Sequence, residues 1–209
     1  MFWAGESGGV SAPVRQQDRS RATQRRLLDA TVDCLVEVGW AGTTTTLVSE
    51  RAGVSRGAQL HHYPTKDALV LAAVAHLAQR RREELETEAA GVLVLPLPER
   101  VDRVIELLSG VYVGPLFQAA LELWVAARTD PALHDALVPL EAKFGRDLHR
   151  FAVRQLGADE RQPGVRQSVQ ATLDLLRGLG VASLLTDDTE RRASLLAEWK
   201  RQLVRKLSE

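Results

Sequence analysis

The 209-residue sequence has a single cysteine, few aromatic residues and no hydrophobic run long enough to span a bilayer. One cysteine, Cys34, excludes an intrachain disulfide and is typical of a reducing compartment. A transmembrane helix needs about 20 consecutive apolar residues, and no segment approaches that length. The N-terminal segment also lacks the apolar centre of a signal peptide. We therefore expect a cytoplasmic protein with no membrane partner.

Recognisable signatures of catalysis and metal binding are absent as well. The sequence has no glycine-rich phosphate loop, no Cys/His zinc spacing and no Ser/His/Asp signature. His61 and His62 are adjacent, so on a helix they diverge by about 100° and do not chelate one metal together. Neighbours in the set His134, Glu141 and His149 lie about 10 Å or more apart along a helix. The sequence therefore predicts no catalytic residue, no metal site and no cofactor.

Net charge is zero, with 27 basic and 27 acidic residues, but the charges are unevenly distributed. The segment 15–82 holds 11 basic and 6 acidic residues, a net charge of +5, which leaves −5 for the rest. A basic N-terminal third on an acidic remainder is typical of a polyanion-binding module joined to a second domain.

Apolar residues recur every three or four positions through most of the chain, which predicts about nine helices and no sheet. A first helix should run from about Gln16 to Val38 and stop at Gly39. Two short helices should follow, at 45–52 and 56–62. Gly53 suits the turn between them, because it adopts a left-handed conformation readily, and Pro64 ends the second.

The remaining segments also favour helices. A fourth helix should reach about Ala90, and residues 91–98 are interpreted as a linker or a frayed helix end. A long helix from Pro131 to Leu156 should kink or break near Pro139. The last two helices are expected at about 165–185 and 189–207.

The pair of short helices forms a helix-turn-helix unit. A short second helix with polar side chains fits the major groove of B-DNA. Arg56 near its start is the residue type that pairs bidentately with guanine, and Gly57 permits close approach of the DNA. Hydroxyl groups at the start of the preceding helix suit phosphate contacts.

The stretch TTTTLVSERAGVSRGAQLHHYPTKDALV resembles the DNA-binding signature of the tetracycline-repressor (TetR) family, and the similarity extends from about Gln24 to Leu71. The resemblance implies an all-α fold with a three-helix DNA-binding domain at 16–66 and a ligand-binding and dimerisation domain at 67–209. A disordered leader is expected at 1–15. The resemblance to the TetR family also implies a homodimer in which the last two helices of each subunit form a four-helix bundle.

The motif and the resemblance together assign a set of residues to double-stranded operator DNA. Leu60 departs from the family pattern, because many members carry a phosphate-contacting tyrosine there. Either Gln59 or His61 is expected to replace that phosphate contact. His62 is expected to pack beneath the second short helix, 56–62, which is the recognition helix. The predicted DNA-binding residues are Thr44, Thr45, Ser55, Arg56, Gly57, Gln59, His61, Tyr63 and Lys66.

Two further sets are expected in the second domain. Apolar walls with isolated polar tips favour a small, mostly hydrophobic or aromatic effector. The predicted ligand-binding residues are Tyr112, Phe117, Leu121, Trp124, Arg128 and His134. A stripe on the last two helices predicts the dimer interface, with Gly180 allowing close approach of a partner helix. Its residues are Leu173, Leu176, Gly180, Leu184, Leu195, Trp199 and Leu203.

The leading hypothesis is a ligand-responsive DNA-binding regulator, in particular a repressor released from its operator by an effector. One alternative is a DNA-binding regulator without a small-molecule effector. The other is an all-helical enzyme that reuses the pocket, for which no residues offer support.

Overall fold

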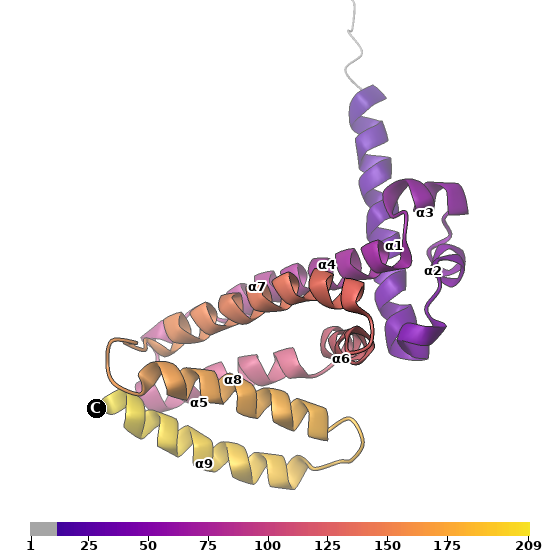
Figure 1. The fold of residues 1–209 in the computed structure, drawn as a ribbon. Coiled ribbons are helices and arrows are strands. Elements are labelled where there is room, and N and C mark those ends of the chain that lie inside the picture. Colours follow the sequence, from indigo (N-terminus) through magenta and orange to yellow (C-terminus); the bar gives the residue numbers. More distant parts are fainter. Residues whose placement is uncertain (1–11) are drawn as a thin grey trace, which may run out of the picture. The chain divides into compact units, whose positions relative to one another are not determined.

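The computed structural model describes residues 12–209, with side chains from Gln17 onward, and this part of the chain is helical without strands (Figure 1). The expected all-α fold with about nine helices is confirmed for these residues. The helices are α1 (Ala12–Gly42), α2 (Thr45–Ala52), α3 (Arg56–His62), α4 (Lys66–Glu88), α5 (Leu97–Ser109), α6 (Pro115–Ala127), α7 (Pro131–Leu156), α8 (Val165–Ala182) and α9 (Thr189–Ser208), with 3₁₀ turns η1 (Val92–Val94) and η2 (Gly110–Tyr112).

The chain divides into two compact units between Ala73 and Val74, within α4. The expected functional boundary between residues 66 and 67 stays a prediction. Residues 1–11 of the expected leader lie outside the described residues, and α1 begins at Ala12, four residues before the expected start.

The N-terminal unit is built on the apolar face of α1. Leu27, Cys34 and Leu35 are buried, together with Val48 of α2 and Leu69 of α4. Burial also raises the pKa of the Cys34 thiol, as expected for a small core side chain. Gly39 has a left-handed φ of 67° and interrupts α1, as predicted from its position.

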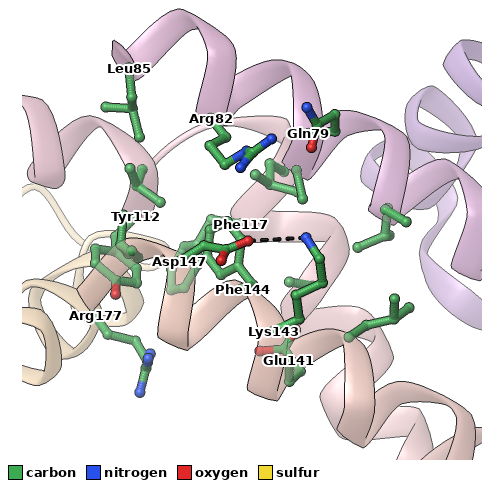
Figure 2. Close-up of a pocket in the computed structure, with 18 of the residues that line it drawn as sticks. Gln79, Arg82, Leu85, Tyr112, Phe117, Glu141, Lys143, Phe144, Asp147 and Arg177 are labelled. Carbon is green, nitrogen blue, oxygen red and sulfur yellow. Dashed lines mark hydrogen bonds and ion pairs between the residues drawn. The ribbon is translucent and has the colours of Figure 1, made fainter. Parts of the chain in front are cut away.

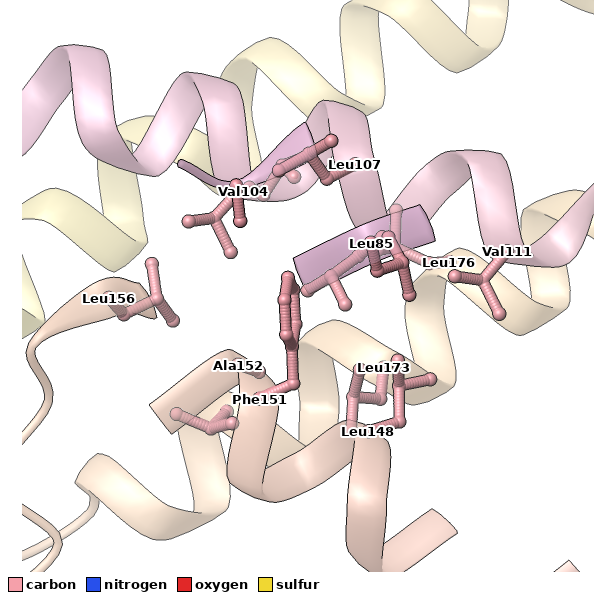
Figure 3. Packing of buried hydrophobic residues seen from close by; sticks show 14 of the residues in the cluster. Leu85, Val104, Leu107, Val111, Leu148, Phe151, Ala152, Leu156, Leu173 and Leu176 are labelled. Carbon is pink, nitrogen blue, oxygen red and sulfur yellow. The ribbon is translucent and has the colours of Figure 1, made fainter. Parts of the chain in front are cut away.

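The C-terminal unit has one large core. Figure 3 shows its buried side chains, among them Leu85 of α4, Val104 of α5, Phe151 of α7 and Leu173 of α8. Helix α5 contacts α7, α8 and α9. Within this unit α7 continues through Pro139, where a kink or break was predicted. Residues 91–98 form the turn η1 and the start of α5, consistent with the expected linker.

Among the described residues no single helix is long and apolar enough to cross a membrane. The bent pair Leu97–Tyr112 and Pro115–Ala127 passes the same test by length and composition, and it contributes many of the buried core side chains.

Candidate functional site

Side-chain caps fix the two short helices of the N-terminal unit. The Thr44 hydroxyl accepts from the backbone N–H of Leu47 (3.1 Å), and the Ser55 hydroxyl accepts from that of Ala58 (3.3 Å). Gly53 ends α2 with a left-handed φ of 61°. Thr44 and Ser55 are both exposed, and each capping hydroxyl keeps its own O–H for an outside acceptor such as a phosphate oxygen.

Helix α3 presents one exposed face. Arg56, Gly57, Leu60 and His61 are exposed, at positions that lie on one side of a helix. A Cβ placed on Gly57 would have no atom within 4 Å, so the glycine is not required by packing inside the chain. This face can approach another molecule closely and offers a guanidinium, an imidazole and an apolar side chain.

Gln59 lies on the opposite side of α3, which corrects its expected place at DNA. It is 0% exposed, and its amide Nε2 donates to the Tyr63 carbonyl at 2.6 Å. Gln59 precedes the exposed Leu60 by one residue, and successive side chains on a helix point about 100° apart, so Gln59 faces the core. Between Gln59 and His61, only His61 is therefore available to replace the missing tyrosine contact.

Lys66 is also engaged within the chain. Its Nζ donates to the Trp40 carbonyl (2.5 Å) and lies 4.0 Å from the centroid of the Trp40 ring. Burial lowers the pKa of the Lys66 ammonium. The half-buried His62 ring contacts those of His61 and Tyr63, and burial raises the pKa of Tyr63. These contacts tie the end of α3 to its own unit.

The C-terminal unit contains a cavity of about 240 Å³. Its lining comes from α4, α6, α7, α8 and the turn η2, and Figure 2 shows the aromatic and charged side chains around it. Ring centroids of Tyr112 and Phe117 are 5.6 Å apart, and those of Phe117 and Trp124 are 6.2 Å apart, both edge to face. The cavity therefore has an aromatic wall.

Charged groups also border this cavity. The Arg177 guanidinium carbon lies 5.7 Å from the Tyr112 ring centroid and 5.9 Å from that of Trp124. Burial raises the pKa of Glu141, an effect partly offset by Trp124 and Arg177. Burial likewise raises the pKa of Tyr112. Asp147 accepts from Lys143 (3.0 Å) and Arg150 (2.5 Å), and these contacts lower its pKa. The wall is thus apolar with a few polar groups.

A family model described as bacterial regulatory proteins of the tetR family matches residues 27–73. A helix-turn-helix transcriptional regulator of Mycobacterium tuberculosis is 32% identical over 144 residues, which cover 69% of this chain and 73% of that one. The regulator CymR of Pseudomonas putida is 32% identical over 182 residues, 84% of this chain and 86% of its own. The chain belongs to the TetR family of transcriptional regulators.

Solved structures share the fold of this TetR-family chain. A transcriptional regulator from Streptomyces coelicolor A3(2) has a TM-score of 0.67 at 18% identity, covering 90% of this chain and 99% of that one. The multidrug binding protein EbrR, crystallised with ethidium, has a TM-score of 0.60 at 22% identity, covering 85% and 97%. The fold, with an N-terminal helix-turn-helix for DNA binding, is therefore that of the TetR family.

Only half of the six residues expected at the effector line the cavity. Tyr112, Phe117 and Trp124 do, whereas Leu121 packs against the core cluster. Arg128 and His134 are exposed and absent from the lining, and His134 contacts Asp135 at 3.2 Å. Arg128 directly follows α6, and His134 lies in the first turn of α7.

The expected dimer stripe is largely covered within the chain, which corrects its interpretation as free surface. Leu173, Leu176 and Leu203 are buried in the core cluster. Trp199 packs against that cluster, and its Nε1 donates to the Thr172 hydroxyl (2.9 Å). A Cβ on Gly180 would clash with the Tyr112 carbonyl oxygen of the same chain. The only exposed residues of the predicted set are Leu184 and Leu195.

Sequence reasoning missed Glu141 and Arg177 as cavity residues, although a signal was present. Glu141 stands four residues after Leu137 and three before Phe144, on the inward face of α7. Arg177 stands four residues after the buried Leu173 on α8. A charged residue at an inward position of an amphipathic helix is a candidate for a polar role in a site.

Proposed function

We propose that this TetR-family regulator is a repressor that binds operator DNA as a homodimer and leaves it when a small effector occupies the cavity. The observation that carries the proposal is the aromatic-walled cavity of about 240 Å³ in a chain with a DNA-binding helix-turn-helix. An apolar cavity with a few polar groups is typical of a small-molecule site. That EbrR was crystallised with ethidium supports such a site by analogy alone.

The DNA contacts follow from the exposed face of α3. Arg56 would read a guanine edge, Gly57 would let the helix approach closely, and His61 would contact the backbone or a base edge. Leu60, at 44% exposed, would meet an apolar group such as a thymine methyl. Thr44, Thr45 and Ser55 would donate to phosphates.

The proposed dimer surface is the outer face of α8 and α9. Leu175, Gly178 and Ala182 recur there at three and four residues, ending in Leu185, which is 93% exposed. Leu195 adds an exposed side chain from α9. Two copies joined here would match the two half-sites of an operator, whose centres lie about 34–36 Å apart. We propose this face as the dimer interface instead of the stripe through Gly180 that the sequence predicted.

Helix α4 gives the proposal a route for coupling. It begins at Lys66 next to the recognition unit in sequence and contributes Gln79, Arg82 and Leu85 to the cavity wall. An effector that binds one position of α4 better than another shifts the population between DNA-binding and released states.

The test begins with an operator selected from random duplex DNA by the full-length chain. Compounds are then screened for loss of DNA binding by fluorescence anisotropy. In the variant Ala120→Leu a larger side chain enters the cavity, so DNA binding should persist while the response to the compound is lost. Sedimentation should show a dimer, and Leu175→Asp should weaken it.

The matched control is Val138→Leu, a similar enlargement at an exposed position of α7 outside the cavity. It should keep both DNA binding and the response. If Ala120→Leu kept a full response, the effector would bind elsewhere. If no compound released the DNA, the regulator without a small-molecule effector would be the better hypothesis.

A further inference from the structure

Two charged residues occupy inward positions of the helices that line the cavity. Glu141 follows the apolar spacing of α7, and Arg177 interrupts the otherwise apolar run 175–181 of α8. Placing a charge in the wall of an apolar cavity costs free energy unless a partner of opposite charge or a hydrogen bond compensates for it. Arg177 has such a partner in Asp174 (3.1 Å), and its side chain is partly exposed. Glu141 is therefore the residue whose place in the wall points to a polar function within the cavity.

Hydrogen-bond donors in the cavity wall exceed their acceptors. The Tyr112 hydroxyl, the Trp124 indole N–H and Arg177 Nε are all buried, and none has a partner in hydrogen-bond geometry among the described residues. The Trp124 indole is close enough to Glu141 to lower the pKa of that carboxyl, so Glu141 is the acceptor that a bound anion would replace. Tyr112 itself is only 3% exposed. An indole N–H and a guanidinium N–H are donors only, so each needs an acceptor. Buried donors of this kind are normally paired.

The charges of the wall also favour an acceptor that carries negative charge. Asp147 is already matched by Lys143 and Arg150, at 3.0 and 2.5 Å. Arg177 donates to Asp174, which lies outside the lining, at 3.1 Å. On the lining itself the three cations Arg82, Lys143 and Arg177 outnumber the two carboxylates Glu141 and Asp147 by one. Burial raises the pKa of Glu141, so its carboxyl takes up a proton more readily than an exposed glutamate.

Size and wall chemistry define the rest of the ligand. A dry apolar cavity of about 150 Å³ is enough to hold benzene, and this cavity of about 240 Å³ is larger. Phe117, Phe144 and Phe151 surround it with flat apolar surfaces. One ring with modest substituents fits this space.

We propose that the effector is a small organic anion with a flat apolar body and one carboxylate-like end, whose oxygens accept hydrogen bonds from Tyr112, Trp124 and Arg177. This inference rests on the proposed function of the cavity and adds the chemical class of its ligand. A cationic ligand paired with Glu141 is the opposite outcome. It would occupy Glu141, the carboxylate beside Trp124, and add positive charge to a lining that already holds one more cation than carboxylate.

The test compares three probes of one shape, namely benzoate, benzamide and benzylammonium, by titration calorimetry with the full-length chain in the absence of DNA. We expect benzoate to bind about tenfold or more tightly than benzamide, because hydrogen bonds to a charged group are the stronger ones. We expect benzylammonium to bind weakest. Equal binding of benzoate and benzamide, preferred binding of benzylammonium, or no binding of any probe at about 1 mM would overturn the proposal.

Variants then locate the anion. Arg177→Gln and Tyr112→Phe should each reduce benzoate binding about tenfold and leave benzamide binding less affected. Glu141→Gln should strengthen benzoate binding, because it removes one of the two carboxylates of the lining. Arg166→Gln makes the same charge change on α8 at an exposed residue outside the cavity, and it should change neither. Loss of benzoate binding on Glu141→Gln, in a variant whose melting temperature is not lowered, would contradict the proposal.

DNA release separates this inference from the proposed function. If the anion binds in the cavity with this selectivity but leaves DNA affinity unchanged, the ligand class stands and the regulatory function fails. If a cation releases the DNA and Ala120→Leu abolishes that response, the function stands and the ligand class fails.

Discussion

The exposed face of α3 and the cavity of the C-terminal unit are organised in opposite ways. On α3 the functional side chains of Arg56, Leu60 and His61 lie within one stretch of six residues and are all exposed. In the cavity they come from η2, α6, α7 and α8 and point inward. Helix geometry alone decides which residues share the face of α3, whereas the packing of several helices decides what meets in the cavity.

This difference predicts how substitutions behave. A change on the exposed face of α3 should affect DNA binding and leave folding intact. A change in the cavity wall alters packing and ligand contacts together, so each experiment there needs a control that reports stability.

The largest effect is expected for Gly180→Ala, which tests whether this face of α8 points inward. Its Cβ would meet the backbone carbonyl of Tyr112 and the Phe117 ring. Backbone atoms do not give way as a flexible side chain does, so we expect a loss of about 1–3 kcal/mol in the free energy of unfolding, measured by urea denaturation.

Gly145→Ala is the matched control, because a Cβ on this glycine of α7 has no atom within 4 Å. It should stabilise the chain by about 0.5–1 kcal/mol through helix propensity. Were Gly180→Ala to fold as stably as the parent and only weaken dimerisation, the original interpretation of Gly180 as an interface residue would be restored.

Arg56→Ala and Gln59→Leu test the two sides of α3. Arg56→Ala should cost about 1–3 kcal/mol of affinity for the selected operator and relax the preference at one base pair. Gln59→Leu should leave DNA affinity and base preference unchanged, because this side chain is buried. Anisotropy titrations on the operator and on its single-base variants measure both, and a changed base preference in Gln59→Leu would contradict the orientation of α3.

The helix-turn-helix was predictable from the sequence because its signals are local. The bounds 45–52 and 56–62 follow from a threonine cap, a glycine turn and a proline stop, and the structure confirms both. The same spacing did not reveal that Gln59 faces inward. The polar side chain of Gln59 suggested an exposed residue. Its position on the helix, about 100° from the exposed Leu60, places it in the core.

The cavity was predictable only in part. Tyr112, Phe117 and Trp124 were identified from aromatic spacing near α6. Glu141 and Arg177 required knowledge of which faces of α7 and α8 point inward. The same gap explains the dimer stripe, because an apolar stripe on a helix is the same pattern whether its own chain or a partner covers it.

Lys66→Ala should have a moderate effect on the N-terminal unit. The ammonium loses its hydrogen bond to the Trp40 carbonyl and its contact with the Trp40 ring, which together are worth about 1–2 kcal/mol. Thermal denaturation measures that loss. The salt dependence of DNA binding should stay unchanged, and a decrease in its slope by about one unit would show that Lys66 reaches a phosphate as first expected.

The smallest effect is expected for Glu141→Gln, through the pH dependence of stability. Burial raises the pKa of Glu141 in the folded chain, so between its ordinary and its raised value the folded chain binds more protons than the unfolded chain. The free energy of unfolding therefore falls as pH rises through that window, and at neutral pH the folded chain bears the full cost of burying the ionised Glu141 carboxylate. Glu141→Gln removes this cost, so the variant should be more stable at pH 7 by about 0.5–1 kcal/mol.

The pH dependence of the stability gain also distinguishes a glutamate in the cavity wall from one on an exposed surface. The stability gain of Glu141→Gln should shrink as pH falls below about 4.3, where an ordinary glutamate is protonated in the unfolded chain too. Glu83→Gln, at an exposed position on α4, should change stability by less than about 0.5 kcal/mol at either pH. If Glu141→Gln instead destabilised the chain at pH 7, its carboxylate would act as a stabilising partner of Arg177, and an anionic ligand would have to displace it.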